Sequence, residues 1–540
     1  MITAVIPAKG ASTRLADKNI LEINRLSLIE HAVRFARSSD KIGDIFVSTD
    51  SEEIAKLARR LGAKSIMRGA ELGGEAPLMD VYRHALKEMN NGDITHIVGI
   101  QPDNPDRRTD LDGAIAYALE KNIDYLFTVD RDGHRNGSLT ILSLNALTSE
   151  PSLYASSIRD DCTNIHSRGD FLMASRNLSE SSDFIFLGQR KIGPGEPVFI
   201  VAEAACNHMC DIGLAREMID RAAEAGADGI KFQTYKAERL VTDRADAFWG
   251  DEKISQLEYY KRLDRFGAEE YADLFAYARK KEIVAFSSPF DEQSVDMLAE
   301  LNMPVYKIAS CDITNLNLIR HIARVGKPVI LSTGASSPDE IDGAVEAVFD
   351  EGNYQLILLA CTLSYPTEYS DANLLRIRTL KERYPRMIVG LSDHTEPDEQ
   401  MVVPSIAVSL GAQMIEKHYT LDRSMKGSGH FFAVDPGDLK KMVKNIRLTE
   451  SLFGDGLLDV ALSEERARAS ARRSIVAERT IKMGEIITDE MLGFKRPAGG
   501  LGANRTGEVV GKRARTEIER DRFIDLGDLE PIERTGEPSP

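Results

Sequence analysis

Residues 387–418 read MIVGLSDHTEPDEQMVVPSIAVSLGAQMIEKH, and this stretch decides the fold. Two short apolar runs, at residues 387–391 and 414–416, enclose a helix-like segment. Both runs lead into ionisable side chains, and His394 and His418 stand 24 residues apart, the length of one strand–helix unit. Because parallel strands in such units end at the same edge of the sheet, we expect the two histidines to lie side by side.

Comparable apolar runs occur six more times before this stretch, at residues 198–202, 229–232, 284–287, 305–308, 329–331 and 356–360. Helix-like segments, such as 214–225 and 268–280, separate most of them. Eight strands, most of them followed by a helix, within about 260 residues match the size of a TIM (β/α)8 barrel. The spacing therefore predicts a barrel domain over residues 183–455.

Polar residues follow nearly every predicted strand. In chain order they are Glu203; Lys231 and Gln233; Ser288; Lys307, Ser310 and Asp312; Ser332; Ser364 and Tyr365; Ser392, Asp393 and His394; and Lys417 and His418. Active sites of TIM barrels form where the strands end, so these groups are expected at one mouth. Lysines among hydroxyls suit a phosphorylated, carboxylated small molecule. Two neutral imidazoles suit a catalytic divalent metal, although a histidine pair at this spacing taken alone is more often two hydrogen-bonded loop residues.

Composition excludes several classes of protein. The net charge of the 540 residues is −17 and no basic stripe occurs, so neither a nucleic-acid partner nor a membrane partner is expected. No apolar stretch approaches the roughly 18 residues of a membrane helix, and the first residues, MITAVIPAKG, do not resemble a signal peptide. Five cysteines are too few for a disulfide scaffold. We therefore expect a soluble cytoplasmic enzyme.

The regions on either side of the barrel have different patterns of predicted strands and helices. Residues 1–178 alternate strands, for example 2–7, 44–49, 95–101 and 125–129, with helical stretches, which predicts a mostly parallel, Rossmann-like sheet. Its first strand leads into a loop of small residues, AKGASTR at 8–14, of the kind that approaches phosphates. Residues 471–531 contain short strand-like pieces and turns and predict a small β-rich domain. The fold class is thus α/β, with three domains.

The barrel resembles the sialic acid (N-acetylneuraminate) synthases and their legionaminate and pseudaminate relatives. The matching stretches include AEAACNHMCD (202–211), FSSPFDEQSVDML (286–298), YKIASCDITNLNLI (306–319), GLSDHT (390–395) and GAQMIEKHYTLD (411–422). Residues 471–502 resemble the C-terminal antifreeze-like (SAF) domain of the same family. The resemblance implies condensation of phosphoenolpyruvate with an N-acetylated aminohexose, such as N-acetylmannosamine, to a nonulosonic acid. It also implies a domain-swapped homodimer in which Arg496 reaches the active site of the partner subunit.

The same resemblance assigns roles to individual residues. It makes His394 and His418 the ligands of Mn²⁺ or another divalent cation, and Glu203 a catalytic carboxylate alongside Lys231 and Lys307. It places Lys231, Ser288, Lys307, Ser310, Ser332, Ser364 and Ser392 around phosphoenolpyruvate, and Gln233, Asp312, Tyr365 and Arg496 around the sugar. Three positions depart from the family: Ser364 replaces an asparagine, Asp312 a glutamate, and Gly427-Ser428-Gly429-His430 a Gly-Pro-Asp-His sequence. These departures bear on which amino sugar is used.

The N-terminal domain resembles the acylneuraminate cytidylyltransferases, which make CMP-sugars from CTP. VSTDSEEIA (47–55), MRGAEL (67–72) and GIQPDNPDRR (99–108) carry the resemblance. It implies that CTP, with Mg²⁺ or Mn²⁺, contacts Lys9, Lys18, Asn19 and Arg68, and that Gln101 lies between nucleotide and sugar. At the family's metal-binding Asp-x-Asp this chain has Asn164-Ile165-His166, for which Asp170 could compensate.

We therefore predict a fusion of two enzymes, a nonulosonate synthase and a cytidylyltransferase. One alternative keeps the synthase and makes the N-terminal domain a non-catalytic nucleotide-binding module. A second alternative makes the barrel an aldolase-type lyase that uses free pyruvate through a Schiff-base lysine. Lys231 and Lys307 stand among hydroxyls rather than in an apolar setting, which favours phosphate binding over the lyase.

Overall fold

The computed structural model describes residues 1–10, 15, 17–23, 26–73, 76–90, 92–148, 154–179, 183–246, 254–427 and 429–530. The chain forms two compact units, Met1–Leu452 and Phe453–Pro540. In the part of the chain that the structure describes, no helix is both long enough and apolar enough to cross a membrane.

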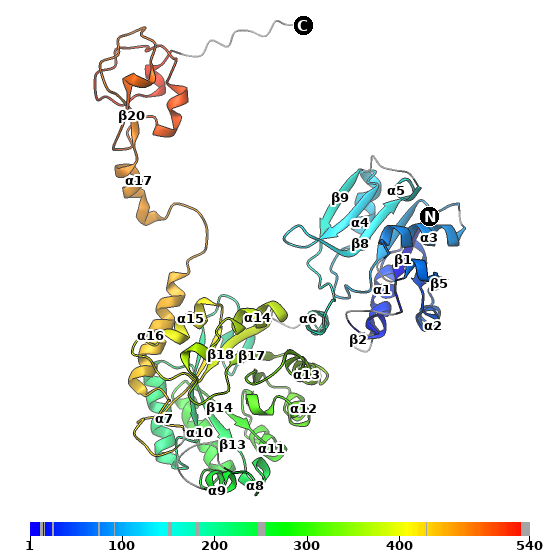
Figure 1. The fold of residues 1–540 in the computed structure, drawn as a ribbon, viewed down its shortest axis with the longest axis vertical. Coiled ribbons are helices and arrows are strands. Elements are labelled where there is room, and N and C mark those ends of the chain that lie inside the picture. Colours follow the sequence, from blue (N-terminus) through cyan, green and yellow to red (C-terminus); the bar gives the residue numbers. More distant parts are fainter. Residues whose placement is uncertain are drawn as a thin grey trace. The chain divides into compact units, whose positions relative to one another are not determined.

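The first unit begins with a seven-stranded sheet in the order β5-β4-β1-β6-β8-β7-β9 (Figure 1). Its strands are β1 (Ile2–Pro7), β4 (Ile42–Thr49), β5 (Lys64–Met67), β6 (His96–Ile100), β7 (Tyr125–Val129), β8 (Arg135–Ser143) and β9 (Ala155–Arg159). Strand β8 pairs antiparallel with β6 and β7, and the other pairs are parallel. The mostly parallel sheet predicted from the sequence is confirmed.

The helices of this sheet domain are α1 (Leu28–Arg37), α2 (Glu52–Arg60), α3 (Leu78–Met89), α4 (Leu111–Glu120), α5 (Leu144–Thr148) and α6 (Arg168–Leu178). Local chemistry fixes where two of them begin: the hydroxyls of Ser27 and Ser51 accept hydrogen bonds from backbone N–H groups in the first turns of α1 and α2. A two-stranded piece, β2 (Glu22–Ile23) and β3 (Leu26–Ser27), precedes α1.

The second part of the first unit is a closed barrel of eight parallel strands, as the spacing predicts. The strands are β12 (Phe199–Ala205), β13 (Gly229–Thr234), β14 (Val284–Pro289), β15 (Tyr306–Ile308), β16 (Val329–Ser332), β17 (Leu356–Cys361), β18 (Ile388–Asp393) and β19 (Met414–His418). The helices are α7 (Ile212–Ala225), α8 (Ala237–Leu240), α9 (Gln256–Lys261), α10 (Ala268–Lys280), α11 (Glu292–Glu300), α12 (Leu316–Arg324), α13 (Pro338–Phe349), α14 (Arg376–Arg383), α15 (Val402–Ser409) and α16 (Pro436–Leu452).

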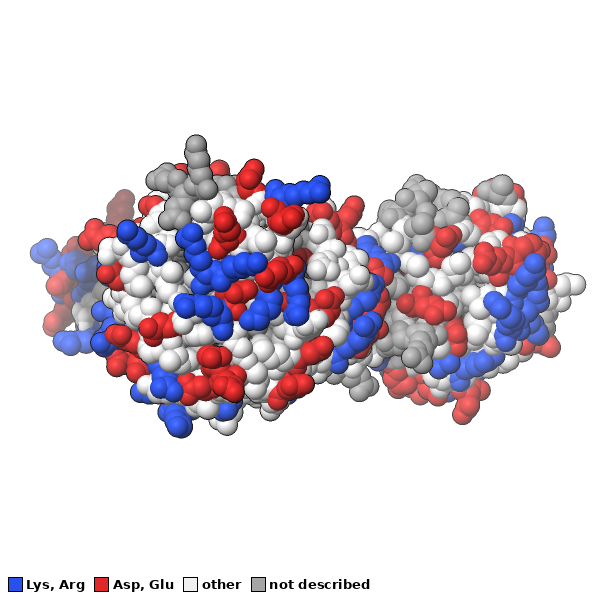
Figure 2. Space-filling model, turned by 90° about the horizontal axis from the view of Figure 1, so that it is seen from below, with Lys and Arg blue, Asp and Glu red and all other residues white. Residues whose placement is uncertain are grey.

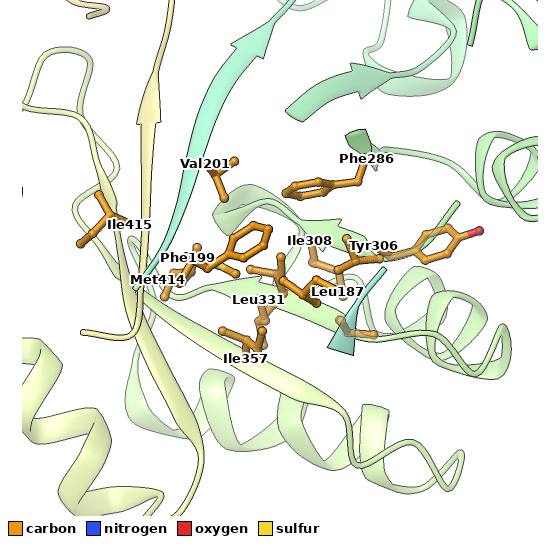
Figure 3. Packing of buried hydrophobic residues seen from close by; sticks show 14 of the residues in the cluster. Leu187, Phe199, Val201, Phe286, Tyr306, Ile308, Leu331, Ile357, Met414 and Ile415 are labelled. Atoms are coloured by element: carbon orange, nitrogen blue, oxygen red, sulfur yellow. The ribbon is translucent and has the colours of Figure 1, made fainter. Parts of the chain in front are cut away.

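A hairpin of β10 (Ile185–Leu187) and β11 (Arg190–Ile192) precedes the barrel and belongs to its core. Leu187 is fully buried in the same cluster as Phe199 and Leu331, and Figure 3 shows it among these barrel side chains. Burying a side chain of this size contributes roughly 1.5–3 kcal/mol. The hairpin therefore stabilises the barrel and is more than a connector.

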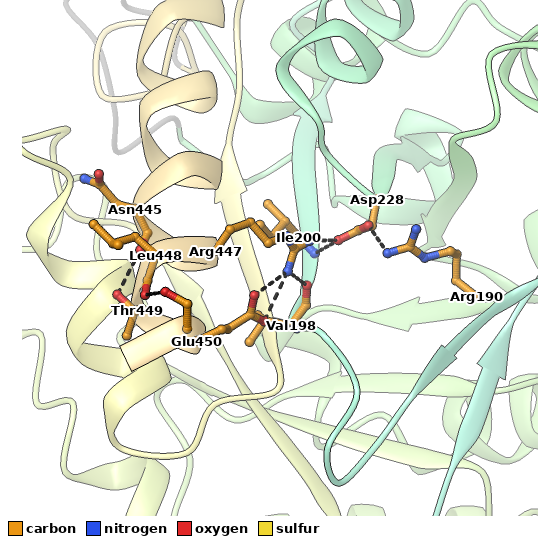
Figure 4. Close-up of polar contacts among 10 residues, drawn as sticks. Arg190, Val198, Ile200, Asp228, Asn445, Arg447, Leu448, Thr449 and Glu450 are labelled. Atoms are coloured by element: carbon orange, nitrogen blue, oxygen red, sulfur yellow. Dashed lines mark hydrogen bonds and ion pairs between the residues drawn. The ribbon is translucent and has the colours of Figure 1, made fainter. Parts of the chain in front are cut away.

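Asp228 connects the first strand of the barrel to its last helix (Figure 4). One carboxylate oxygen accepts hydrogen bonds from the backbone N–H of Ile200 and from Arg447 on α16, both at 2.9 Å, and the other oxygen pairs with Arg190. Arg447 also donates to the carbonyl of Val198. Because α16 is the last barrel helix and Ile200 lies on β12, this network helps to close the ring of strands.

On the face drawn in Figure 2, lysine and arginine side chains lie among aspartate and glutamate side chains. Exposed pairs of this kind, such as Arg216 with Asp273 at 2.6 Å, each contribute little to stability.

The second unit contains α17 (Glu465–Ala471) and an antiparallel pair, β20 (Ser474–Ala477) and β21 (Leu492–Lys495). Isolated bridges and short turns continue this β-rich fold. Its own small core includes Ile475, Ile487, Val509, Ile518 and Ile524. The predicted small C-terminal β-rich domain is therefore present.

The Asp228 network generates a stability prediction. Asp228→Ala leaves the buried N–H of Ile200 without a partner and should lower the free energy of unfolding by about 3 kcal/mol. Arg190→Ala removes only a half-exposed partner and should cost less than about 1 kcal/mol. Urea unfolding of the full chain measures both changes; equal losses in the two variants would contradict the role given to Asp228.

Candidate functional site

Side chains alternate along the barrel strands, and one set points into the barrel near the carboxyl ends. Residues in this set are Glu203 on β12, Lys231 and Gln233 on β13, Ser288 on β14, Lys307 on β15, Ser392 on β18, and Glu416 and His418 on β19, with His394 directly after β18. Most of them are buried, and Gln233 and His418 are partly exposed. Several of the predicted strand-end residues therefore do meet, Glu203, Lys231 and Ser288 among them.

Two lysines and two glutamates form the centre of this site. Lys231 Nζ lies 2.9 Å from Glu203 Oε1, 3.2 Å from Ser288 Oγ and 3.7 Å from Glu416 Oε1. Lys307 Nζ lies 3.6 Å from the same oxygen of Glu416. Buried charges are tolerated when they are paired, and here two cations balance two anions.

The pKa values in this cluster follow from burial and pairing. Burial raises the pKa of Glu203 to about 7, although Lys231 opposes the shift. Burial also disfavours ionised Glu416, but Lys231 and Lys307 outweigh it and hold the pKa of Glu416 below its usual value. Burial lowers the pKa of Lys307. One oxygen of each glutamate is buried with no hydrogen-bond partner, which is costly unless a ligand or water satisfies it.

His394 and His418 lie side by side, as expected, with ring centroids 5.2 Å apart. His394 Nδ1 faces the carbonyl of Thr362 at 2.9 Å, which leaves Nε2 available as a ligand atom. Burial lowers the pKa of His394 to about 4 and that of His418 well below its usual value. Both rings are therefore neutral near pH 7, the form that binds metals.

The donor set at the histidine pair fits a divalent metal that keeps open positions for substrate. Among the described residues, no group of three or more His, Cys, Asp or Glu side chains is arranged to hold a metal. Two imidazoles without a closed ligand set are typical of catalytic rather than structural sites. The ring centroid of Tyr365 lies 4.4 Å from that of His394, and the ring centroid of Phe432 lies 4.9 Å from that of His418. This packing fixes the orientation of both imidazole rings.

The remaining predicted residues have varied surroundings. Ser310 accepts a hydrogen bond from the backbone of Gly334, and the hydroxyl of Ser332 is buried without a partner. Ser364 is exposed and donates to the carbonyl of Pro366. Burial raises the pKa of Asp312 to about 6. Arg496 is exposed in the second unit, and Ser428 lies outside the described residues.

Sequence reasoning missed Glu416 and grouped two other residues with the site wrongly. In MIEKH, Glu416 stands two residues before His418, so strand alternation could have placed both on the inner face. The same alternation puts Lys417 and Asp393 on the opposite face. There they form a buried ion pair at 2.6 Å, with Lys417 also donating to the carbonyl of Thr395. This pair supports the strands that carry the histidines.

The predicted nucleotide site in the N-terminal domain lies around the end of β1. Lys18 is buried, and its ammonium pairs with Asp103 at 2.6 Å and donates to the carbonyl of Ile165 at 3.0 Å. Asn19 donates to the carbonyl of Lys9, and its own side-chain oxygen is buried without a partner. Arg68 is buried, and burial lowers its pKa. Residues 11–14 of the expected phosphate loop lie outside the described residues.

The side chain of Gln101 lies against Gly137. A Cβ atom at Gly137 would come within 2.4 Å of the Gln101 side-chain nitrogen, and Gly137 has a φ of 76°. The positive φ therefore favours glycine here, and any larger residue would also displace the Gln101 amide.

Asp170, which could compensate for the missing metal carboxylates, uses one carboxylate oxygen to cap a helix. Its Oδ2 accepts hydrogen bonds from the backbone of His166 and from the backbone and hydroxyl of Ser167, forming the capping box of α6. The amide of Asn164 and the imidazole of His166 are poor ligands for Mg²⁺, which prefers anionic oxygen. The residues present thus do not fit Mg²⁺ in the manner of an Asp-x-Asp site.

Three family models match the chain: the NeuB family over residues 218–457, Cytidylyltransferase over residues 3–180 and SAF domain over residues 472–530. The N,N'-diacetyllegionaminic acid synthase of Campylobacter jejuni is 37% identical over 60% of this chain and 98% of its own length. The human N-acetylneuraminate-9-phosphate synthase is 32% identical over 62% of this chain and 93% of its own length.

One solved structure supports the same assignment. The putative spore coat polysaccharide biosynthesis protein E of Chromobacterium violaceum is 29% identical, covers 62% of this chain and all of its own, and superposes with a TM-score of 0.52. Together with the barrel geometry, these similarities show that the chain is an enzyme of the NeuB family that carries a cytidylyltransferase domain before its barrel and a SAF domain after it.

Proposed function

We propose that the barrel condenses phosphoenolpyruvate with an N-acetylated aminohexose, and that the N-terminal domain joins the resulting nonulosonic acid to CMP. The observation that carries this proposal is the paired cluster of Lys231, Lys307, Glu203 and Glu416 beside two neutral histidines. The relatives named legionaminic and N-acetylneuraminate-9-phosphate synthases support the substrate class.

The chain's own residues suit each part of the condensation. Lys231 and Lys307 attract the phosphate and carboxylate of phosphoenolpyruvate, and Ser288 and Ser392 offer hydroxyl hydrogen bonds. Carbon 3 of phosphoenolpyruvate then attacks the open-chain sugar aldehyde, water adds at carbon 2, and phosphate leaves. Glu203, with a pKa near 7, is able to hold or release the proton of that water. A bound divalent metal would polarise the aldehyde oxygen as a Lewis acid.

We expect His394 and His418 to hold that metal, which is Mn²⁺ or another divalent cation. His394→Ala and His418→Ala should each abolish condensation and Mn²⁺ binding while leaving thermal stability close to wild type. Calorimetric titration with Mn²⁺ and phosphate release from phosphoenolpyruvate measure the two effects. His321→Ala, which changes a histidine on α12 paired with Asp296, is the matched control and should alter neither. Full activity of wild-type protein in a chelator would contradict the metal requirement.

The linker before the SAF domain supports a swapped homodimer. Large apolar side chains are exposed along it, at Phe453, Leu457, Leu458 and Leu462, with Leu462 85% exposed. Apolar surface of this extent marks an interaction site. A second copy of the chain is the occupant that the proposal assigns, because Arg496 then supplies a cation for the partner's sugar.

Arg496 acts in trans if this assignment is correct. Arg496→Ala should raise the KM for the amino sugar at least tenfold, with a smaller effect on the KM for phosphoenolpyruvate, because one charge-assisted contact to the sugar is lost. Heterodimers of Arg496→Ala and His394→Ala chains should regain part of the activity, since one of their sites carries both groups. Arg513→Ala, an exposed arginine of the same domain, is the control. Absence of rescue in verified heterodimers would argue against the swap.

For the N-terminal domain, we propose cytidylyl transfer from CTP with release of pyrophosphate. Lys9, Arg68 and Asn19 border the site, and cations there would stabilise charge that develops on the phosphates. A second candidate function, nucleotide binding without transfer, is favoured by two observations. Asn164 and His166 stand in place of the metal carboxylates, and one oxygen of Asp170 caps a helix.

The choice between these two functions generates the next prediction. With a nonulosonic acid and CTP, Mn²⁺ should support more pyrophosphate release than Mg²⁺, because Mn²⁺ accepts the imidazole of His166 more readily. His166→Asp should improve turnover with Mg²⁺, and Lys9→Ala should cost at least a hundredfold, while Lys56→Ala on exposed α2 should change nothing. Calorimetric CTP binding without any pyrophosphate release would instead establish the binding module.

A further inference from the structure

Helix α6 ends the cytidylyltransferase domain, yet it packs on the barrel. Leu172 and Met173 are buried in the barrel's hydrophobic cluster, whereas Phe171 packs with Leu28 of the nucleotide domain. Arg168 pairs with Glu346 on α13. Gly169 approaches the backbone of Arg383, whose carbonyl would lie 3.1 Å from an added Cβ. The helix is therefore part of both domains.

Arg386 of the barrel reaches this helix from the turn before β18. Its Nη1 donates to the side-chain oxygen of Asn177 at 2.7 Å, and its Nε donates to Asp183 at 3.0 Å. Asp183 also lies 3.6 Å from the buried Arg176. The backbone of Arg386 has a φ of 70°, a left-handed conformation that non-glycine residues rarely adopt. No part of the synthase mechanism uses this arginine.

Asn177 connects Arg386 to the segment that carries the altered metal positions. Its side-chain nitrogen donates to Asp106 at 2.8 Å and to the hydroxyl of Thr163 at 3.1 Å. Asp106 in turn accepts hydrogen bonds from the backbone and hydroxyl of Thr163. The amide of Asn177 thus uses its oxygen toward the barrel and its nitrogen toward the nucleotide domain.

The same segment is held from the nucleotide side. Ile165 donates its N–H to the carbonyl of Asp103, and its own carbonyl accepts from Lys18. Residues 163–165 are consequently fixed between Lys18, which matches a CTP-binding position, and the pair of Asn177 and Arg386. Asn164 and His166 lie within or next to this clamped segment.

We propose that Arg386 is a positioning residue for the cytidylyltransferase domain, acting through Asn177 to fix residues 163–166. The barrel then sets the affinity of the N-terminal domain for CTP. This inference rests on the proposed nucleotide function of that domain. Arg386 precedes β18, whereas the synthase residues follow the strands, so the two roles are separable by mutation.

Arg386→Gly is the decisive variant, because glycine adopts a φ of 70° without strain and only the side-chain contacts are lost. It should raise the Kd for CTP roughly fivefold or more, as expected for a residue in a shared hydrogen-bond network. It should also speed hydrogen exchange in a peptide covering residues 160–166. Asn177→Ala should do the same. The Kd for CTP of the double variant should be no higher than that of the weaker-binding single variant, because both substitutions break the same hydrogen-bonded connection between Arg386 and Asn177. Phosphate release by the barrel should stay within twofold of wild type.

Arg216→Ala is the matched control, since it removes an exposed barrel arginine that pairs with Asp273 away from α6. It should leave CTP affinity and exchange at 160–166 unchanged. Unchanged CTP affinity and exchange in Arg386→Gly, or additive effects in the double variant, would overturn the proposal. If wild-type protein binds no CTP, the proposed nucleotide function fails. The exchange measurement then still decides whether Arg386 positions residues 163–166.

Discussion

Charge balance inside a closed barrel is the constraint on which the synthase site depends. Strand alternation forces Lys231, Lys307, Glu203 and Glu416 into the same water-poor interior, and none of these charges is tolerable alone. Pairing two lysines with two glutamates offsets the cost of burying their charges. In the proposed condensation, an incoming phosphate and carboxylate would compete for the lysines and leave the glutamates with raised proton affinity. The same pairing therefore stabilises the fold and prepares the binding site.

The orientation of the histidine pair depends on the ion pair of Asp393 and Lys417 on the outer face of the same strands. His394 and His418 face inward only because Asp393 and Lys417, one residue earlier on each strand, face outward and are satisfied there by a buried ion pair. Thr395 adds hydrogen bonds to both members of that pair. An inward histidine pair and an outward ion pair thus come from two consecutive residues at the ends of two neighbouring strands. A substitution in the ion pair should therefore shift the histidines, and a substitution of a histidine should shift the ion pair.

Periodicity and motifs predict much of this architecture, and the failures have physical causes. Strands β1 and β7 match their predicted bounds because their apolar runs are uninterrupted. Strands β8 and β9 are not predicted from the sequence. Their sequences, RNGSLTILS and ASSIR, mix polar and apolar residues and contain no uninterrupted apolar run of the kind seen in β1 and β7. Glu416 escapes notice because a lone glutamate in a short strand resembles a surface residue until its neighbours are known. Roles taken from family resemblance, such as that of Arg496, stay predictions.

The junction between the cytidylyltransferase domain and the barrel shows what composition alone does not reveal. The polar run at 177–183 predicts a break between domains, because linkers are rich in such residues. In the structure, Asn177 and Asp183 within this run are the residues that bind Arg386 of the barrel. The sequence does not distinguish a polar side chain that forms an ion pair or hydrogen bond across a domain junction from one that is only solvated. Only the position of Arg386, more than two hundred residues later in the chain, separates them. Long-range pairs of this kind therefore require coordinates, because nothing in the local sequence of either partner identifies the other.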